Sequence, residues 1–230
     1  MAYRGKGDYE RALADFEQAI LLAPSDARLY TDRGVTYELL DDYTSAIGDF
    51  NRAIAVKPNH APAIEGRGRT YFYLGNFAQA AADFQRGLAV DTADGYGALW
   101  LHLARRRLRQ DDSEDFVSHA SRIDGSRWPA PLVSYMLGGL PLDSVRALAA
   151  ASELNGHSQR CVVSFYLGEE SLFEGEESRA ASLFDETRTT CPREFNEHRA
   201  AVAELRRMAR TPLLTGGPDS ASGAPAITTR

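Results

Sequence analysis

The sequence predicts an all-α fold: a solenoid of helix-turn-helix hairpins with an irregular helical middle and a C-terminal capping helix. The first observation is a 34-residue spacing that relates Tyr3, Tyr37 and Tyr71. The second is that small, acidic and aromatic residues keep the same spacing, namely Ala12, Ala46 and Ala80, Asp15, Asp49 and Asp83, and Phe16, Phe50 and Phe84. The third is that apolar residues recur at three- and four-residue steps, which is the helical period. Repeats of this length are typical of stacked helix pairs.

The N-terminal part contains one truncated and two full repeat units. The truncated unit keeps a stub of its first helix and a second helix over about residues 8–22, which Pro24 ends because proline disfavours helix in the residue before it. The full units cover residues 27–58 and about 61–92, and Gly75-Asn76 forms the turn inside the second of them.

The interior of each unit follows from its small positions. Gly34 and Ala46 are small where two helices are expected to cross, and Phe50 fills the space beside them. The same logic applies to Gly68, Ala80 and Phe84 in the next unit.

After Asp91 the repeat pattern weakens and then returns. Helices are predicted over about residues 95–109, 113–122, 131–137 and 142–151. Gly168, Ala180, Phe184 and Pro192 then restore the mutual spacing of a repeat, and a capping helix is predicted over about residues 193–210. The tail is rich in Gly, Pro, Ser, Thr and Ala, so it should be disordered. This predicts an N-terminal array (1–122), an irregular connector (123–155), a C-terminal hairpin with its capping helix (156–210) and a tail (211–230).

The order of small, aromatic and proline positions resembles the tetratricopeptide repeat. The resemblance implies a curved stack whose concave surface binds other proteins. The C-terminal half resembles NlpI-like bacterial lipoproteins more narrowly, on the stretches FYLGE (165–169), EGE (174–176), AASLF (180–184) and EFNEHRA (194–200). Leu99-Trp100-Leu101 lies where that family carries an LW helix, and residues 134–138 resemble its irregular middle.

The narrower resemblance implies a location and a kind of partner. It implies a periplasmic or outer-membrane-associated protein that works as a homodimeric adaptor and brings cell-wall hydrolases and a processing protease together. The lipidation cysteine of that family is missing here, so membrane contact is expected only through an anchor not present in this chain. Tyr3 already occupies the eleventh position of a repeat, which suggests a fragment of a longer protein.

Charge and hydropathy argue against a nucleic-acid binder and give no sign of a transmembrane helix or a signal segment. The net charge of −6 and pI near 5.4 argue against a dedicated nucleic-acid binder, which carries a basic excess. No apolar run approaches the roughly 18 residues of a transmembrane helix. The first ten residues, MAYRGKGDYE, contain no hydrophobic signal core.

The inner-face positions of the two full units are the predicted contact surface for a protein or peptide. Arg69, Phe72 and Tyr73 are residue types that anchor peptides, although the aromatic rings would also suit packing against a neighbouring repeat. The predicted surface consists of Arg28, Thr31, Val35, Glu38 and Leu39 from the first full unit and Glu65, Arg69, Phe72 and Tyr73 from the second.

The two cysteines fall at opposite ends of the returning hairpin. Cys161 opens its first helix and Cys191 follows its second, and antiparallel helices bring those ends to the same side. A disulfide there would suit an oxidising compartment. Two free thiols remain an alternative, as does a metal site with His157 and His198, although the spacing lacks tight ligand pairs.

The sequence also carries a basic run, Arg105, Arg106, Arg107 and Arg109, which Asp111, Asp112, Glu114 and Asp115 follow at once. One interpretation is a helix C-terminus stabilised by cations before an acidic first turn. Another is a patch for an acidic partner beside Trp100.

No nucleophile elbow, phosphate loop or metalloprotease motif appears, so no enzyme, cofactor or metal is predicted. The sequence therefore predicts a non-catalytic adaptor. A cytoplasmic scaffold, or the docking portion of an enzyme whose catalytic domain lies upstream, stays an alternative.

Overall fold

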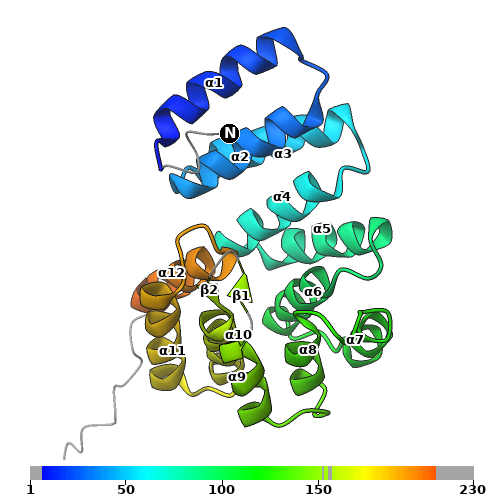
Figure 1. Ribbon diagram of the computed structural model, residues 1–230, viewed down its shortest axis with the longest axis vertical. Helices are drawn as coiled ribbons and strands as arrows, with labels where there is room; N and C mark the ends of the chain where they lie inside the picture. Colours follow the sequence, from blue (N-terminus) through cyan, green and yellow to red (C-terminus); the bar gives the residue numbers. More distant parts are fainter. Residues whose placement is uncertain (1–6, 152, 155–156, 211–230) are drawn as a thin grey trace, which may run out of the picture.

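The computed structural model describes residues 7–151, 153–154 and 157–210, and in these ranges the chain is all-α apart from one short β ladder (Figure 1). The helices are α1 (Tyr9–Leu22), α2 (Ala27–Leu39), α3 (Tyr43–Val56), α4 (Ala61–Tyr73), α5 (Phe77–Val90), α6 (Gly95–Arg107), α7 (Ser113–Ala120), α8 (Ala130–Met136), α9 (Leu142–Ala151), α10 (Arg160–Phe173), α11 (Glu177–Thr190) and α12 (Asn196–Arg210). The predicted all-α solenoid is confirmed.

The helices stack as successive pairs. Helices α2 and α3, α4 and α5, and α10 and α11 pack as hairpins, and α1 packs on α2. In Figure 1, α1 to α5 form the upper part of the molecule, and α10 to α12 lie beside α6, α8 and α9 in the lower part. The last helix, α12, also packs against α4, so the C-terminal hairpin and its cap close onto the N-terminal array.

Glycine and phenylalanine positions fit each other at the helix crossings. A Cβ atom built on Gly34 would lie 2.8 Å from the Phe50 ring, and one built on Gly66 would lie 2.7 Å from the same ring. In the returning repeat, a Cβ atom on Gly168 would lie 2.6 Å from Phe184. The predicted crossing of small residues beside Phe50 is therefore confirmed, and Gly66 joins it from the next repeat.

The larger of the two hydrophobic clusters is centred on Trp100 of α6. The Trp100 ring contacts Phe72, Phe84 and Phe165, with ring centroids 5.1, 6.0 and 5.5 Å apart. These residues belong to α4, α5 and α10, so one core joins the N-terminal array to the C-terminal hairpin. A smaller cluster surrounds Phe50 in the first full repeat.

The periodic aspartates have a structural partner. Arg33 donates two hydrogen bonds to Asp49, each 2.7 Å long, and Arg67 donates to both oxygens of Asp83 at 2.8 and 2.6 Å. Each arginine directly precedes a periodic glycine in the sequence. The same ion-pair geometry therefore links the two helices of each full hairpin.

The connector departs from its predicted form. Residues Glu153–Leu154 (β1) pair antiparallel with His157–Ser158 (β2), a ladder that the sequence pattern does not indicate. The capping helix begins at Asn196, and residues 192–195 form a turn before it. The predicted stub of the first helix and the predicted disordered tail lie outside the described residues. Within those residues no helix has the length and apolarity to cross a membrane.

Candidate binding surface

The predicted inner-face residues lie on α2 and α4, but the structure divides them by exposure. Arg28 is exposed, and Val35, Leu39, Glu65 and Arg69 are half-buried. Thr31, Glu38, Phe72 and Tyr73 are buried. These four buried side chains therefore cannot form a contact surface for a partner.

Helix α12 explains the burial of Tyr73. The Tyr73 hydroxyl donates to the backbone oxygen of Asn196 at 3.3 Å, and the Arg199 guanidinium lies 5.9 Å from the Tyr73 ring centroid. Arg207 donates to the backbone oxygens of Phe72 and Tyr73 at 3.3 and 2.9 Å. The prediction that Phe72 and Tyr73 anchor a peptide is wrong, because Tyr73 is covered by α12 and Phe72 packs on Trp100.

Glu38 and Thr31 are also corrected from contact residues to interior residues. Glu38 is fully buried and accepts a hydrogen bond of 2.7 Å from the Thr70 hydroxyl, and its other oxygen lies 4.0 Å from Arg199. The Thr31 hydroxyl donates to the backbone oxygen of Ala27, one turn earlier, at 2.8 Å. Both side chains use their polar atoms inside the helix stack.

Glu65 and Arg69 face a pocket of about 330 Å³ instead. Helix α4 forms one wall, the beginning of α6 forms another, and the corner between α11 and α12 forms the third. The described residues that line it are Glu65, Arg69, Phe84, Asp94, Tyr96, Gly97, Trp100, Val162 and residues 194–197. We call this site the groove pocket. The sequence pattern indicated its α4 wall only, because the other walls come from segments 25 to 130 residues further along the chain.

Three carboxyl groups of the groove pocket, those of Glu65, Asp94 and Glu197, have raised pKa values. Burial, together with the nearby Asp94, raises the pKa of Glu65 to about 7, although Arg69 opposes the shift. Burial also raises the pKa of Asp94 and of Glu197. Asp94 accepts hydrogen bonds from the backbone N–H groups of Tyr96 and Gly97 at 3.1 and 2.9 Å, so it also caps α6.

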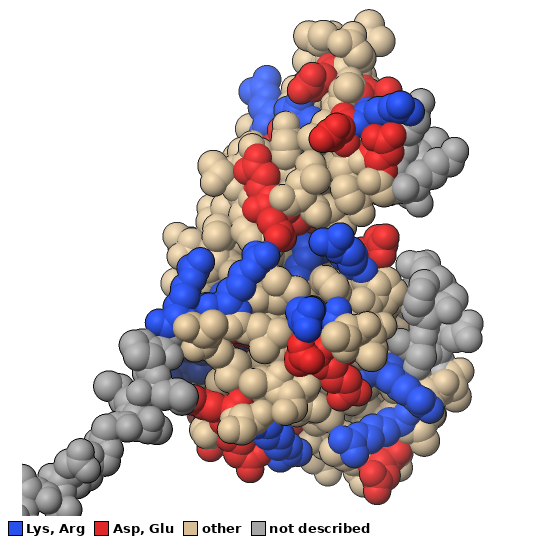
Figure 2. Space-filling model, turned by 90° about the vertical axis from the view of Figure 1, so that its left-hand side faces the viewer, with Lys and Arg blue, Asp and Glu red and all other residues tan. Residues whose placement is uncertain are grey.

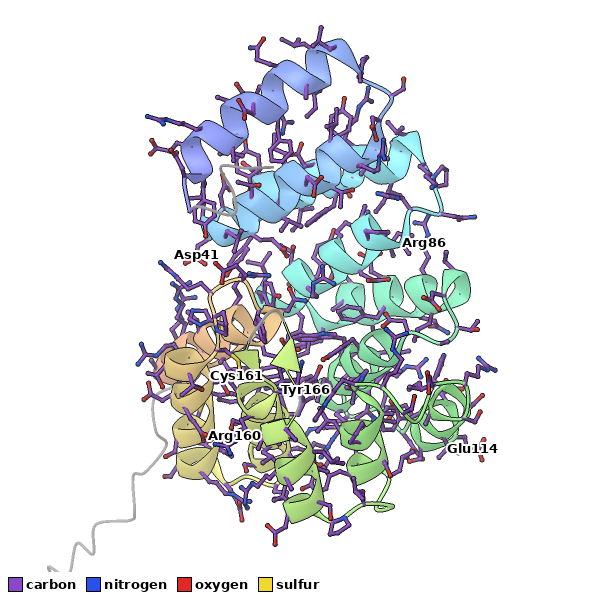
Figure 3. All side chains as sticks on the ribbon, in the orientation of Figure 1. Asp41, Arg86, Glu114, Arg160, Cys161 and Tyr166 are labelled. Atoms are coloured by element: carbon purple, nitrogen blue, oxygen red, sulfur yellow. A yellow bond between two sulfur atoms is a disulfide. The ribbon has the colours of Figure 1, made fainter. Side chains whose placement is uncertain are left out.

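A disulfide between Cys161 and Cys191 holds the third wall. Their Cα atoms are 5.3 Å apart, and the bond joins the first turn of α10 to the end of α11 (Figure 3). Val162 follows the first cysteine directly, and residues 194–197 begin three positions after the second. The disulfide therefore fixes two parts of the pocket wall to each other.

Arginines of the basic run form ion pairs with acidic side chains of the same chain. Arg107 donates to Glu169 at 2.9 and 3.1 Å, and its Nη2 atom lies 2.6 Å from Glu204. Arg105 pairs with Asp115 at 2.8 Å, which fits the interpretation of a helix end followed by an acidic turn. The sequence pattern did not indicate the buried link from Arg107 to α10 and α12.

The described residues contain no group of three or more His, Cys, Asp or Glu side chains placed to hold a metal ion. Figure 2 shows the left-hand side of Figure 1, where basic and acidic side chains are interspersed. That face offers no extended field of one sign for a polyanion.

The fold and the groove define a class of protein, the helical-repeat proteins that present a concave surface. Two tetratricopeptide repeat models match the chain, over residues 1–65 and 66–131. Together these matches cover more than half of the chain, and the chain belongs to the tetratricopeptide repeat proteins.

Solved structures support the same fold. A tetratricopeptide repeat protein from Parabacteroides merdae is 18% identical, with a TM-score of 0.52, over 87% of this chain and 80% of that one. A double mutant described as MamA RS-1 ArsTM is 16% identical, with a TM-score of 0.52, over 91% of this chain and 92% of that one. These likenesses concern the fold alone, and the comparisons do not support membership of the NlpI-type group.

Proposed function

We propose that this tetratricopeptide repeat protein is a non-catalytic adaptor that docks a protein segment at the groove pocket. The observation that carries the proposal is the pocket itself, which is lined by Glu65 and Arg69. Tetratricopeptide solenoids expose extended concave surfaces for binding. The burial of Thr31, Glu38, Phe72 and Tyr73 removes them from the predicted surface. Of the predicted residues that keep exposed area, Glu65 and Arg69 are the two that line this pocket.

We further propose a place in the bacterial cell envelope, with an envelope protease or a peptidoglycan hydrolase as client. The resemblance to NlpI-like lipoproteins suggests this assignment. The Cys161–Cys191 bond supports it, because disulfides persist in oxidising compartments such as the periplasm. Fractionation of cells that express the full-length gene tests the location, and recovery in the cytoplasmic fraction alone would contradict it.

Site-specific photo-crosslinking tests the docking site. A photoreactive amino acid at Glu194, an exposed residue on the rim of the pocket, should capture a partner protein in envelope extracts. The matched control places the same amino acid at Glu114, an exposed residue on α7 (Figure 3). Identical cross-linked products from both positions, or none from Glu194, would count against docking at the groove pocket.

We also propose that the chain forms a homodimer, as the envelope resemblance implies. Multi-angle light scattering at micromolar concentration measures this directly. A mass of about 25.3 kDa at every concentration would identify a monomer and reject the proposal.

A further inference from the structure

The charges that line the groove pocket are unbalanced. Among the described residues, four acidic side chains, those of Glu65, Asp94, Glu194 and Glu197, face a single basic one, that of Arg69. The Glu65–Arg69 pair is loose, with Oε2 and Nη1 4.0 Å apart. Arg199 is not among the lining residues, and its guanidinium lies 4.0 Å from Glu38, whose negative charge opposes its positive charge. Carboxyl groups therefore outnumber basic groups around the pocket, and a bound cation would favour the ionised form of Glu65, whose pKa is about 7.

Aromatic rings also line the same pocket. Trp100, Phe84 and Tyr96 all line it, and Trp100 is only 2% exposed. Aromatic faces attract cations through their quadrupole, most strongly when the cation leaves bulk water. Carboxyl groups and aromatic rings around one pocket combine the two features that favour a positively charged group.

A buried hydroxyl without a hydrogen-bond partner lies next to the residues that line the pocket. Tyr166 on α10 is fully buried, and its hydroxyl has no hydrogen-bond partner. Burial, together with the charges of Glu197 and Asp94, raises the pKa of this hydroxyl, and the Tyr166 ring centroid lies 6.3 Å from that of Trp100, which lines the groove pocket. Figure 3 shows Tyr166 in the centre of the molecule, far from the surface around Glu114. A buried hydroxyl of this kind is a ready acceptor for an N–H donor.

We infer that the groove pocket takes a single basic side chain, the guanidinium of arginine or the ammonium of lysine, from the docked protein segment. A volume of about 330 Å³ suits one long side chain, because ligand pockets begin at about 300 Å³. The inserted N–H groups would bond to Glu65 and Glu197, with the aliphatic stem along Trp100. An acidic segment would meet four carboxylates and is disfavoured. This inference rests on the proposed adaptor function.

The first experiment uses small probes on the intact chain labelled with ¹⁵N. Ethylguanidinium and n-butylammonium reproduce the two basic head groups, and n-butanol serves as the neutral control. Both cations should cause saturable shifts of the backbone amides of Tyr96, Gly97 and Asn196, and butanol should not. Shifts that fail to saturate, or that spread evenly over the acidic surface, would overturn the inference.

A matched pair of variants then separates the pocket from overall charge. At pH 8, above the Glu65 pKa of about 7, Glu65→Gln and Glu114→Gln each remove a negative charge, but only Glu65 lines the pocket. We expect Glu65→Gln to weaken binding of ethylguanidinium about tenfold, or about 1.4 kcal/mol, because the variant loses a hydrogen bond to a charged group. Glu114→Gln should leave the affinity unchanged. Equal effects from both variants, with folding verified by circular dichroism, would overturn the inference.

The second experiment separates this inference from the adaptor proposal. Peptides selected from a display library on the intact chain are compared with versions in which each Arg or Lys is replaced by Gln. Loss of binding at one basic position supports the inference. Peptides that shift groove amides but keep their affinity after every replacement would overturn it and leave the adaptor function standing. A library that yields no peptide binding at the groove would overturn both.

Discussion

At the scale of single residues, the periodic glycines set the distance between helices. Gly34 and Gly66 come from successive repeats, and both lie against the fully buried Phe50 ring. Because that ring cannot move into solvent, a methyl group at either position must displace packed atoms. Glycine therefore recurs at these positions because the helices cross too closely for a Cβ atom beside the Phe50 ring.

This argument predicts opposite effects for two glycine substitutions in one hairpin. Gly34→Ala should lower the free energy of unfolding by about 1–3 kcal/mol, because overpacking a core costs about that much. Gly48→Ala, on the exposed face of α3 with no atom within 4 Å of the new Cβ, should raise it by up to about 1 kcal/mol through helix propensity. Urea denaturation measures both, and stabilisation by Gly34→Ala would refute the packing argument.

Glu65 illustrates a residue that the fold does not favour in its charged form. Its pKa rises from 4.5 to about 7, since burial and the neighbouring Asp94 and Asp91 outweigh the attraction of Arg69. The folded protein therefore holds a proton on Glu65 where the unfolded chain has released it. As a result, the contribution of Glu65 to stability falls as the pH rises from about 4.5 to about 7.

The corresponding prediction concerns Glu65→Gln, which imitates the protonated acid. Relative to the unmodified chain, the variant should gain of the order of 1–3 kcal/mol of stability between pH 4.5 and pH 8, by the linkage of pKa to folding. Thermal denaturation across this pH range measures the gain. The opposite result would be a stability difference between variant and parent that turns against the variant as the pH rises from 4.5 to 8. That result would show that the charged form of Glu65 stabilises the fold. A gain in stability with a loss of cation binding would identify a functional residue.

At the scale of elements, the α10–α11 hairpin differs from the earlier hairpins in how it is fastened. The Arg33–Asp49 and Arg67–Asp83 pairs secure the N-terminal hairpins. At the equivalent positions the C-terminal hairpin has Leu167 and Leu183, and it carries the disulfide instead. A covalent link therefore takes the place of an ion pair in the hairpin that shapes the pocket.

Reduction of this disulfide should destabilise the chain. A bridge that closes a loop of 30 residues is expected to contribute about 3–4 kcal/mol by restricting the unfolded state. Melting in the presence of a phosphine reductant should occur at a lower temperature than without it. The double variant Cys161→Ala, Cys191→Ala is the control, because its melting temperature should not respond to the reductant. A parent chain that responds no more than this control would contradict the prediction.

At the scale of the whole molecule, one arginine joins the middle of the chain to its last helices. Arg107 on α6 pairs with Glu169 on α10 and with Glu204 on α12, and both carboxyl groups are buried. Arg207 adds a second bond to Glu204, and Arg206 pairs with Asp41 at 3.0 Å, near the turn after α2 (Figure 3). These contacts hold α12 against the N-terminal array.

Arg107→Ala should therefore loosen the entire assembly. Removing one partner of a buried ion pair leaves charges without compensation and is expected to cost about 3–5 kcal/mol. Hydrogen exchange should show reduced protection in α10 and α12 together, and less change in α2 and α3. Arg179→Ala, which breaks an exposed pair with Glu176, should change stability by less than about 1 kcal/mol and serves as the comparison. Equal losses from the two variants would contradict the proposed role of Arg107.

The sequence by itself determined the helices, their pairing and the packing around Phe50, because these depend on contacts within a repeat or between successive repeats. It also predicted Glu65 and Arg69 as binding residues, and that role stays a prediction. Only the tertiary structure decided that Phe72, Tyr73 and Glu38 are interior and that the pocket has walls from α6 and the α11–α12 corner. The physical reason is that α12 returns to α4 over more than a hundred residues, and no local periodicity encodes that distance.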